Sequence, residues 1–301
     1  MKEKVLVIGG TGFIGFNLLK KLKTNKYDLF SVSTKKPSNN KKLKGVKYII
    51  FDISKKKELI KKLKKYNFAI LINLGGNIDH GKKITTTKSH FIGVKNLVDY
   101  FNKKKLNLFI QIGSSLEYGD IKSPQKETSP CKPKRYYGLA KYNASNYIIN
   151  SKHLNFNYLI LRLYQVYGPH QDDKRLIPFV IKSCLANKIF DCTDGSQVRN
   201  FLYITDLIEL LLKIIKSNKI KNGIYNVGNK NSVKVRSIIK IINQIIKKGN
   251  PKFGKIKMRT DEIEKLYPNI KKIKSHFKWT SKTNIKDGLI KTILHYAKRP
   301  A

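Results

Sequence analysis

The chain has 301 residues, of which 41% are hydrophobic, enough to bury a sizeable core in one large α/β unit or two modest domains. No run of 18 apolar residues occurs, and the first residues lead directly into a predicted strand, so we expect neither a membrane span nor an export signal. The three cysteines (Cys131, Cys184 and Cys192) and the six histidines show no metal-ligand spacing. We therefore expect a cytoplasmic protein without a metal site.

The net charge of +44 comes mainly from lysine, because only 7 of the 63 basic residues are arginine. The lysines are spread along the chain at polar positions of predicted helices, for example within residues 55–57 and 61–65. Proteins that read nucleic acids use arginine forks and concentrate their charge on one face. We therefore interpret the lysines as solvated surface, expect no specific nucleic-acid partner, and regard the rare arginines as positions that require a planar guanidinium.

Apolar runs alternate with amphipathic stretches through the first half of the chain, which is typical of βαβ units on a parallel sheet. We predict strands at 4–8, 28–33, 46–51, 68–74, 106–113 and 157–163, and helices at 13–24, 55–65, 87–104 and 136–153. Residues 80–86 and 118–135 are predicted loops at the carboxyl ends of strands, where ligands bind in open α/β sheets. The predicted fold class is therefore α/β, with a doubly wound parallel sheet.

After residue 168 the predicted elements become shorter and less regular. We predict helices at 175–187, 205–217, 233–247 and 285–297, and short strands at 189–193, 200–203 and 224–227. This half is too irregular for a second doubly wound sheet, so we expect a smaller α/β cap. The predicted domains are residues 1–168, to which some later segments return, and residues 169–301.

The strand-to-helix turn near the N-terminus carries a glycine-rich loop that predicts dinucleotide binding. Gly9 allows the tight turn, Gly12 lets backbone N–H groups approach a pyrophosphate, and Gly15 lets the helix pack close to the sheet. The N-terminus of the following helix offers unpaired donors to the anion. A glycine loop alone is a weak signal, but a strand, loop and helix in this order make it informative.

A second motif places a phenol and an ammonium one helical turn apart, at Tyr137 and Lys141. A nearby cation stabilises a phenolate and lowers its pKa, so that the phenol can exchange a proton with a substrate oxygen. Ser114 stands about twenty residues upstream at a predicted strand end, where its hydroxyl can share that oxygen. Tyr-x-x-x-Lys alone is common on surface helices, so the prediction depends on all of these motifs together.

With these motifs in this order, the chain resembles the extended short-chain dehydrogenase/reductase family, in its nucleotide-sugar epimerase/dehydratase/reductase branch. The resemblance covers essentially the whole length and includes Asp52-Ile53, the Ser-Ser-x-x-Tyr-Gly run from Ser114, and the segments 162–169 and 199–203. It implies a Rossmann domain, a nucleotide-sugar-binding cap over residues 169–301, and a homodimer formed through the helices at 87–104 and 136–153.

The resemblance also implies a role for each matching residue. Ser114 is similar to the hydroxyl partner, Tyr137 to the acid/base, and Lys141 to its electrostatic support and ribose ligand. The implied cofactor-binding residues are Gly9, Thr11, Gly12, Phe13, Ile14, Gly15, Thr34, Lys35, Asp52, Ile53, Leu74, Gly75, Gly76, Tyr137, Lys141, Leu163 and Val166. The implied substrate-binding residues are Ser115, Gln165, Arg175, Leu176, Arg199 and Arg259, and the arginines match those that clamp the diphosphate.

Two departures from the family pattern narrow the expected reaction. The predicted second strand ends in Ser33-Thr34-Lys35 without the acidic residue that takes the ribose hydroxyls in NAD-binding members, which favours NADP(H), although NAD(H) stays possible. Ser115-Leu116 stand where dehydratases place Asp-Glu, and strand alternation predicts that Glu117 points elsewhere. We therefore expect a reductase that transfers hydride to C4 of a nucleotide-diphosphate 4-keto-sugar. The alternatives are a 4-epimerase with tightly bound NAD and a non-catalytic NADP-binding protein.

Overall fold

The computed structural model describes residues 2–22, 26–77 and 81–298. The chain divides into two compact units, each assembled from several segments. The first unit comprises residues 1–121, 127–163 and 208–226, and the second comprises residues 122–126, 164–207 and 227–301. The chain therefore passes between the units more often than a single boundary after residue 168 would require. The segment that returns to the first unit is 208–226.

The first unit is built on a seven-stranded sheet with the strand order β11-β6-β5-β4-β1-β2-β3. Neighbouring strands from β6 through to β3 pair in parallel, and the order reverses between β1 and β4. The strands are β1 (Glu3–Ile8), β2 (Tyr27–Ser33), β3 (Val46–Ile50), β4 (Ile70–Asn73), β5 (Leu108–Ser114), β6 (Asn157–Leu163) and β11 (Gly223–Val227). This is the doubly wound sheet predicted from the sequence, and its reversal point is where such folds bind ligands.

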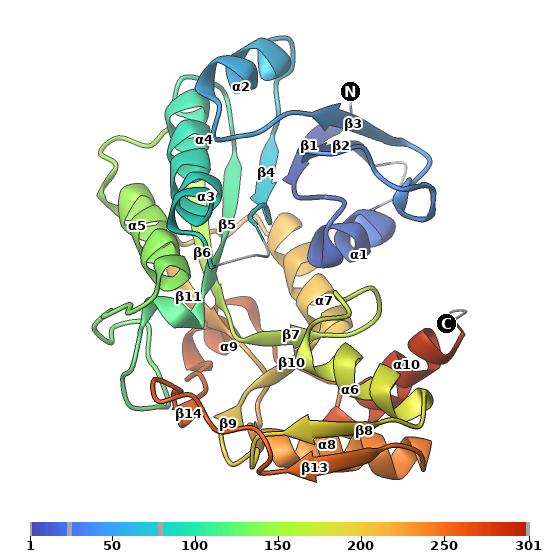
Figure 1. Cartoon of the computed structure of the whole chain (residues 1–301). Coiled ribbons are helices and arrows are strands. Elements are labelled where there is room, and N and C mark those ends of the chain that lie inside the picture. Colours follow the sequence, from blue (N-terminus) through green and yellow to red (C-terminus); the bar gives the residue numbers. More distant parts are fainter. Residues whose placement is uncertain (1, 23–25, 78–80, 299–301) are drawn as a thin grey trace. The chain divides into compact units, whose positions relative to one another are not determined.

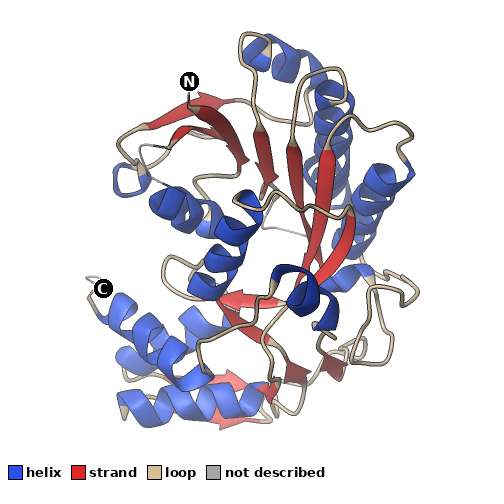
Figure 2. Cartoon of the chain, turned by 180° about the vertical axis from the view of Figure 1, so that it is seen from behind, coloured by secondary structure: helices blue, strands red, loops and turns tan. Residues whose placement is uncertain are grey.

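Helices cover both faces of this sheet (Figures 1 and 2). In Figure 1, α2, α4 and α5 run along one face, and α1 lies on the other. The helical elements are α1 (Phe13–Leu22), α2 (Lys56–Leu63), α3 (Lys83–Thr87), the π-helical turn η2 (Lys88–Ile92), α4 (Gly93–Phe101), α5 (Tyr136–Asn150) and the 3-10 turns η1 (Asn39–Lys41) and η3 (Ser115–Glu117). The predicted loop at 80–86 is therefore wrong over 83–86, which is helical. Residues 23, 24 and 80 of the predicted elements lie outside the described residues.

Burial on both faces explains why the strands read as continuous apolar runs rather than alternating ones. Val5, Leu6 and Val7 of β1 are all fully buried. On the face covered by α2 and α4, the ring of Phe68 meets Phe30 edge-on at 5.1 Å and Phe101 at 6.3 Å. Such edge contacts add to the area that the aromatic side chains bury. The core therefore fixes the strand ends that carry the site.

The second unit contains shorter sheets and four complete helices within its described residues. β7 (Gln165–Tyr167) pairs in parallel with β10 (Phe201–Tyr203), and β9 (Val198–Arg199) lies between β12 (Val233–Lys234) and β14 (Lys265–Leu266). The remaining elements are β8 (Ile189–Cys192), which pairs with β13 (Asn250–Phe253), and the helices α6 (Leu176–Leu185), α8 (Val235–Ile246), α9 (Lys271–Phe277) and α10 (Ile285–Ala297). α7 (Ile204–Ile215) begins in this unit and continues into the first.

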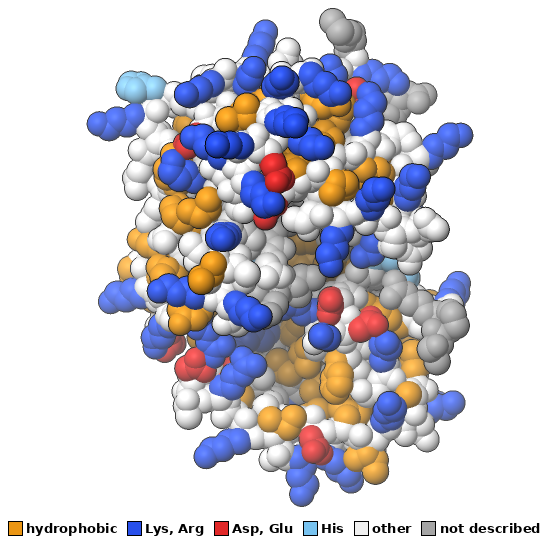
Figure 3. Space-filling model, turned by 45° about the horizontal axis from the view of Figure 1, so that its top comes forward, with side chains coloured by type: hydrophobic (Ala, Val, Ile, Leu, Met, Phe, Trp, Pro, Cys, Tyr) orange, Lys and Arg blue, Asp and Glu red, His pale blue; other side chains and the backbone are white. Residues whose placement is uncertain are grey.

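Lys and Arg side chains are distributed over the face drawn in Figure 3 rather than gathered into one patch. Cys131, Cys184 and Cys192 are free thiols. Over the described ranges, no three His, Cys, Asp or Glu side chains are grouped so that they could hold a metal ion. No helix in that part of the chain combines the length and the apolarity needed to cross a membrane.

Candidate active site

The glycine loop between β1 and α1 forms a cradle in which side chains have no room. Gly9 has a φ of +75°, and a Cβ there would lie 2.9 Å from the Leu74 carbonyl oxygen. A Cβ on Gly15 would lie 2.3 Å from the Gly9 carbonyl oxygen, so the start of α1 must pack directly on the loop. Gly12 is exposed, and a Cβ would add bulk where the loop is open. Bare backbone at a helix N-terminus fits the pyrophosphate of a dinucleotide.

A chain of close contacts connects this cradle with Tyr137. A Cβ built on Gly9 would lie 3.0 Å from the Cα of Gly75, which follows β4. The next residue, Gly76, has a φ of +155°, and a Cβ there would lie 1.9 Å from Cε1 of His90. The His90 ring meets the Tyr137 ring edge-on at 4.9 Å between centroids. The predicted cofactor segments after β1 and β4 and the predicted acid/base on α5 therefore belong to one continuous region of the first unit.

Lys141 is a buried cation on the same helix as Tyr137. Its ammonium lies 5.9 Å from the centroid of the Tyr137 ring and donates a 2.7 Å hydrogen bond to the Ile112 carbonyl oxygen. The side chain is 4% exposed. Burial lowers the pKa of Lys141 to about 8, and the negative charge of Glu117 opposes this decrease. The ammonium is therefore held close to its titration point beside the phenol.

Ser114 ends β5 and caps the 3-10 turn η3. Its hydroxyl oxygen accepts a 3.2 Å hydrogen bond from the Leu116 amide, and its side chain is buried. A Cβ on Gly138 would lie 2.5 Å from the Leu116 carbonyl oxygen, so α5 packs closely on η3 at the residue after Tyr137. The three predicted catalytic residues thus come from β5 and the first two turns of α5, which pack together. Ser115, predicted to touch substrate, is 3% exposed.

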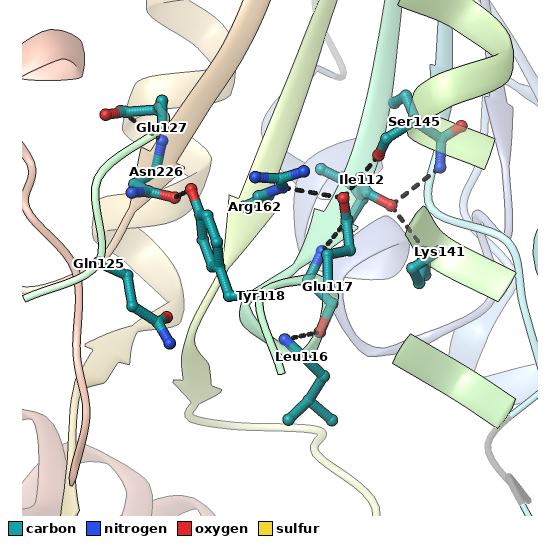
Figure 4. A network of polar contacts seen from close by, with 12 residues as sticks. Ile112, Leu116, Glu117, Tyr118, Gln125, Glu127, Lys141, Ser145, Arg162 and Asn226 are labelled. Carbon is teal, nitrogen blue, oxygen red and sulfur yellow. Dashed lines mark hydrogen bonds and ion pairs between the residues drawn. The ribbon is translucent and has the colours of Figure 1, made fainter. Parts of the chain in front are cut away.

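Glu117 was expected to point away by strand alternation, but alternation does not apply to it because residues 115–117 form a 3-10 turn. Figure 4 shows its carboxylate directed inward toward Arg162 of β6. The Arg162 guanidinium lies 4.4 Å from the centroid of the Tyr118 ring, and the Tyr118 hydroxyl donates to Asn226 of β11 at 2.8 Å. Burial raises the pKa of Tyr118 to about 12. Glu117, Arg162, Tyr118 and Asn226 therefore form a polar network next to Ser114.

The predicted adenine contacts follow β3. An Asp52 carboxylate oxygen accepts a 2.8 Å hydrogen bond from the Ser54 amide, and Ile53 is buried. The Asn96 side chain donates to the Ile53 carbonyl oxygen at 3.0 Å and thereby ties this segment to α4. Asn96, like His90, was not predicted. The sequence feature that could have revealed Asn96 is a single amide side chain on an otherwise apolar helix face.

Other predicted cofactor residues differ in exposure. Thr34 and Lys35 are exposed after β2, where the Ser33 hydroxyl donates to the Lys35 carbonyl oxygen at 2.7 Å. Leu163 is buried at the end of β6, and Val166 is half-buried in β7 of the second unit. The half-buried members of the predicted set at the N-terminal loop and after β4 are Gly9, Thr11, Phe13, Ile14, Leu74 and Gly75.

The predicted substrate residues other than Ser115 belong to the second unit. Gln165 is exposed in β7, and Arg175 and Leu176 are exposed where α6 begins. Arg259 is exposed in the segment between β13 and β14. Each of these side chains is accessible to a ligand, and their binding roles stay predictions.

Arg199 differs from this exposed set because it is 6% exposed. One guanidinium nitrogen donates to the Val198 and Glu264 carbonyl oxygens at 2.8 and 3.2 Å, and the other donates to the Glu262 carboxylate. The Glu262 side chain is 28% exposed. The fork predicted to bind a diphosphate is therefore oriented by backbone carbonyls and paired with a partly exposed carboxylate.

Comparison with known proteins identifies one matching family. The sequence model described as the NAD dependent epimerase/dehydratase family matches residues 5–228, which include the glycine loop, Ser114, Tyr137 and Lys141.

Curated relatives of similar length match nearly the whole chain. A protein of Methanocaldococcus jannaschii described as a putative UDP-glucose 4-epimerase is 28% identical over 98% of this chain and 98% of its own. The CDP-abequose synthase of Salmonella muenchen is 24% identical over 97% of this chain and 98% of its own. The crystal structure of the UDP-glucose 4-epimerase of Thermotoga maritima with UDP-glucose superimposes with a TM-score of 0.91 at 22% identity, covering 98% and 99% of the two chains. At that identity the structural likeness establishes the fold.

Proposed function

Because the chain belongs to the NAD dependent epimerase/dehydratase family, we propose that it transfers hydride between a nicotinamide cofactor and a nucleotide-diphosphate sugar. The observation that carries this proposal is the buried Lys141 ammonium beside Tyr137 on a helix that packs against the turn capped by Ser114. The glycine cradle supports the cofactor part, because a Cβ at Gly9 or Gly15 would collide with backbone atoms. A non-catalytic binding protein would have no need to bury an ammonium at this cost.

In the proposed mechanism, the loop of Gly9, Gly12 and Gly15 would hold a nicotinamide cofactor, which would supply or accept the hydride at the sugar carbon. Tyr137 gives its phenolic proton to the sugar oxygen as a carbonyl becomes an alcohol, or takes that proton in the reverse direction. The Lys141 ammonium stabilises the phenolate that remains. The Ser114 hydroxyl donates to the same sugar oxygen and orients it for proton transfer.

The reaction that we favour is reduction at C4 of a nucleotide-diphosphate 4-keto-hexose. Family members that remove water from the sugar use a carboxylate pair directly after the hydroxyl residue. This chain has Ser115 and Leu116 there, and the Glu117 carboxylate is buried in an ion pair with Arg162. The similarity to a CDP-abequose synthase over nearly the full length supports a reductase that acts on a deoxysugar.

A 4-epimerase is the second candidate, supported by the 28% identity to a putative UDP-glucose 4-epimerase. An epimerase keeps its cofactor bound and returns the hydride to the other face of the sugar, whereas a reductase releases the oxidised cofactor after each turnover. Absorbance of the purified protein separates these cases. Retained NAD(H) and interconversion of two sugars without added cofactor would support the epimerase, and exchangeable NADPH consumed in stoichiometric amounts would support the reductase.

The second strand favours NADP(H) in this proposal. Thr34 and Lys35 are exposed after β2, so a hydroxyl and an ammonium replace the carboxylate that would repel a 2′-phosphate. NAD(H) is the alternative, because solved relatives such as the UDP-glucose 4-epimerase of Thermus thermophilus are complexes with NAD. Thr34→Asp should shift the preference from NADP(H) toward NAD(H), measured as the ratio of kcat/KM values. An unchanged ratio would contradict the specificity argument.

The diphosphate of the substrate is proposed to bind Arg199, with further contacts from Gln165, Arg175, Leu176 and Arg259. The support for Arg199 is its oriented fork, because a guanidinium held by carbonyl oxygens presents its remaining donors in a fixed direction. The others are supported by exposure and by their match to the family pattern.

We also propose a homodimer formed through α4 and α5. The supporting observation is a surface hollow of about 510 Å³ along α5 and the turn η2 that precedes α4, lined by Phe91, Asn143, Asn146, Tyr147, Asn150 and Ser151. Light scattering of the purified protein measures the mass directly. A monomer at micromolar concentration would contradict this part of the proposal.

Tyr137→Phe tests the proposed chemistry directly. Removing the phenolic proton should reduce kcat by at least about 100-fold, because a positioned acid/base contributes about that much or more. The affinity for the cofactor should be nearly unchanged, as measured by fluorescence of bound NADPH. Tyr136→Phe is the matched control on the adjacent, exposed residue. Turnover retained in Tyr137→Phe would remove the phenol from its assigned role.

A further inference from the structure

The Glu117 carboxylate is held from three directions inside the first unit (Figure 4). One oxygen accepts a 2.7 Å hydrogen bond from the Ser114 amide. The other accepts from the Ser145 hydroxyl at 2.7 Å and from Nε of Arg162 at 2.8 Å. These donors come from β5, α5 and β6, and the Glu117 side chain is fully buried. The carboxylate therefore joins the strand end that carries Ser114 to the helix that carries Tyr137 and Lys141.

We propose that Glu117 is a positioning residue for the active site, with Arg162 as its counterion: it fixes the backbone that presents the Ser114 hydroxyl and supplies the negative charge that stabilises the Lys141 ammonium. This inference rests on the proposed function for the roles of Ser114 and Lys141.

Fixation of Ser114 follows from the contacts around its backbone. The Ser114 amide donates to Glu117, and the Ser114 hydroxyl oxygen accepts from the Leu116 amide, so both ends of a capping box are closed. A Cβ on Gly113 would lie 2.5 Å from the bound carboxylate oxygen, so only glycine leaves room for the carboxylate this close to the strand end. The hydroxyl is thus placed by a carboxylate that never has to touch the substrate.

Stabilisation of Lys141 follows from what surrounds the ammonium. Its hydrogen bond goes to a neutral carbonyl, which leaves most of the cost of burying a charge uncompensated. Ser145, one helical turn after Lys141 on α5, donates to the Glu117 carboxylate, so this charge lies on the same side of the helix as Lys141. The negative charge of Glu117 raises the pKa of Lys141 against the effect of burial. The other titratable side chains on α5 are Tyr136, Tyr137, Tyr142 and Tyr147. Those on α3, η2 and α4, which pack against α5, are Lys83, Lys88, His90, Lys95, Asp99 and Tyr100. Removing the Glu117 charge should therefore make Lys141 lose its proton at lower pH.

Two variants with opposite effects on charge test this inference. The ¹³Cε resonance of Lys141, identified by its loss in Lys141→Met, gives the titration midpoint without any substrate. Glu117→Gln should lower this midpoint by about one pH unit, and Arg162→Met should raise it, although both variants weaken the same ion pair. A purely structural role would lower the melting temperature of both without shifts of opposite sign.

The controls separate this inference from the proposed reaction. Asp206→Asn removes another buried carboxylate, which accepts from the amide and hydroxyl of Thr283 in the second unit at 3.1 Å each, and should leave the Lys141 midpoint unchanged. If Arg162→Met does not fold, its combination with Glu117→Gln removes both charges, and the midpoint should then lie between those of the unchanged protein and Glu117→Gln. In active protein, Glu117→Gln should lower kcat about tenfold at pH 8 with little change in KM for the nucleotide sugar.

An unchanged midpoint in Glu117→Gln, or equal shifts of the same sign in both variants, would overturn the inference even if the enzyme turns over its substrate. A midpoint that moves as expected in a protein without nucleotide-sugar turnover would instead contradict the proposed function and leave the electrostatic coupling in place.

Discussion

Two guanidinium–carboxylate pairs, one in each unit, are built in different ways. In the first unit the side chains of Arg162 and Glu117 are 2% and 0% exposed, and backbone and hydroxyl donors complete the carboxylate. In the second unit the Arg199 side chain is 8% exposed, but the Glu262 side chain is 28% exposed. Only the second pair therefore has a carboxylate that reaches solvent. This difference fits the proposal that Arg199 can release its carboxylate to bind a diphosphate, whereas the first pair is part of the buried framework.

The largest expected effect concerns the stability of the sealed pair. Arg162→Met leaves the Glu117 charge buried without its counterion and should lower the free energy of unfolding by about 3–5 kcal/mol. Glu262→Gln, which removes the exposed partner of the other pair, should lower it by less than about 1 kcal/mol. Urea denaturation of both variants measures the difference. Similar losses would show that the two pairs are equivalent.

The second-largest expected effect is a loss of affinity for the nucleotide sugar when Arg199 is replaced. Arg199→Ala should raise KM for the nucleotide sugar by about 10–100-fold, because a charged hydrogen bond contributes about 1.5–3 kcal/mol. The KM for the nicotinamide cofactor should change little. Steady-state kinetics with each substrate varied in turn provides the test, and equal changes in both KM values would speak against a diphosphate contact.

A smaller effect should follow from freeing Arg199. If Glu262 occupies the fork in competition with phosphate, Glu262→Gln should tighten the binding of a nucleoside diphosphate by about two- to fivefold. Glu264→Gln is a matched control, because it removes the same charge two residues away while only its backbone carbonyl contacts Arg199. Isothermal titration calorimetry with UDP, CDP, GDP and dTDP would measure both variants. Equal tightening in the control would indicate a general charge effect.

The smallest effect is a pH dependence confined to the first unit. Burial lowers the pKa of Lys141 to about 8, so the ammonium is present below that pH and turnover should be halved near pH 8. The contribution of Lys141 to the free energy of unfolding should rise over the same range, because the unfolded chain keeps its proton to higher pH. Loss of turnover is then not a result of unfolding. Binding of a nucleoside diphosphate to Arg199 should not follow this titration.

The sequence predicted the first unit well because its periodicity is strong there. The predicted strand at 157–163 matches β6 to the residue, and the predicted strands at 4–8 and 28–33 end where β1 and β2 end. In the second unit only a long regular helix, predicted at 285–297, matches an element (α10) to the residue. The glycine loop could be located because a fully buried strand, a turn and an amphipathic helix follow one another within twenty residues. The catalytic set was predicted from the order of the motifs, and its roles stay predictions.

The predictions failed where elements are too short to have a period or where local geometry changes. β9, β12 and β14 have two residues each, so no alternation can reveal them. The helix predicted at 87–104 begins at Lys83 and contains the π-helical turn η2, which places the buried His90 against Tyr137. Glu117 was predicted by backbone alternation to point elsewhere, and the 3-10 turn at 115–117, which the sequence did not reveal, is what directs it to Arg162.

The return of residues 208–226 to the first unit decides how this protein can be divided. β11 pairs along β6 and covers what would otherwise be an open strand edge, and its Asn226 accepts a hydrogen bond from Tyr118. A fragment cut after residue 168 would expose the main-chain donors and acceptors of β6, and such edges recruit strands from other molecules. Attempts to produce the first unit by simple truncation should therefore give aggregates. A fragment in which a short linker replaces residues 164–207 should keep its edge covered.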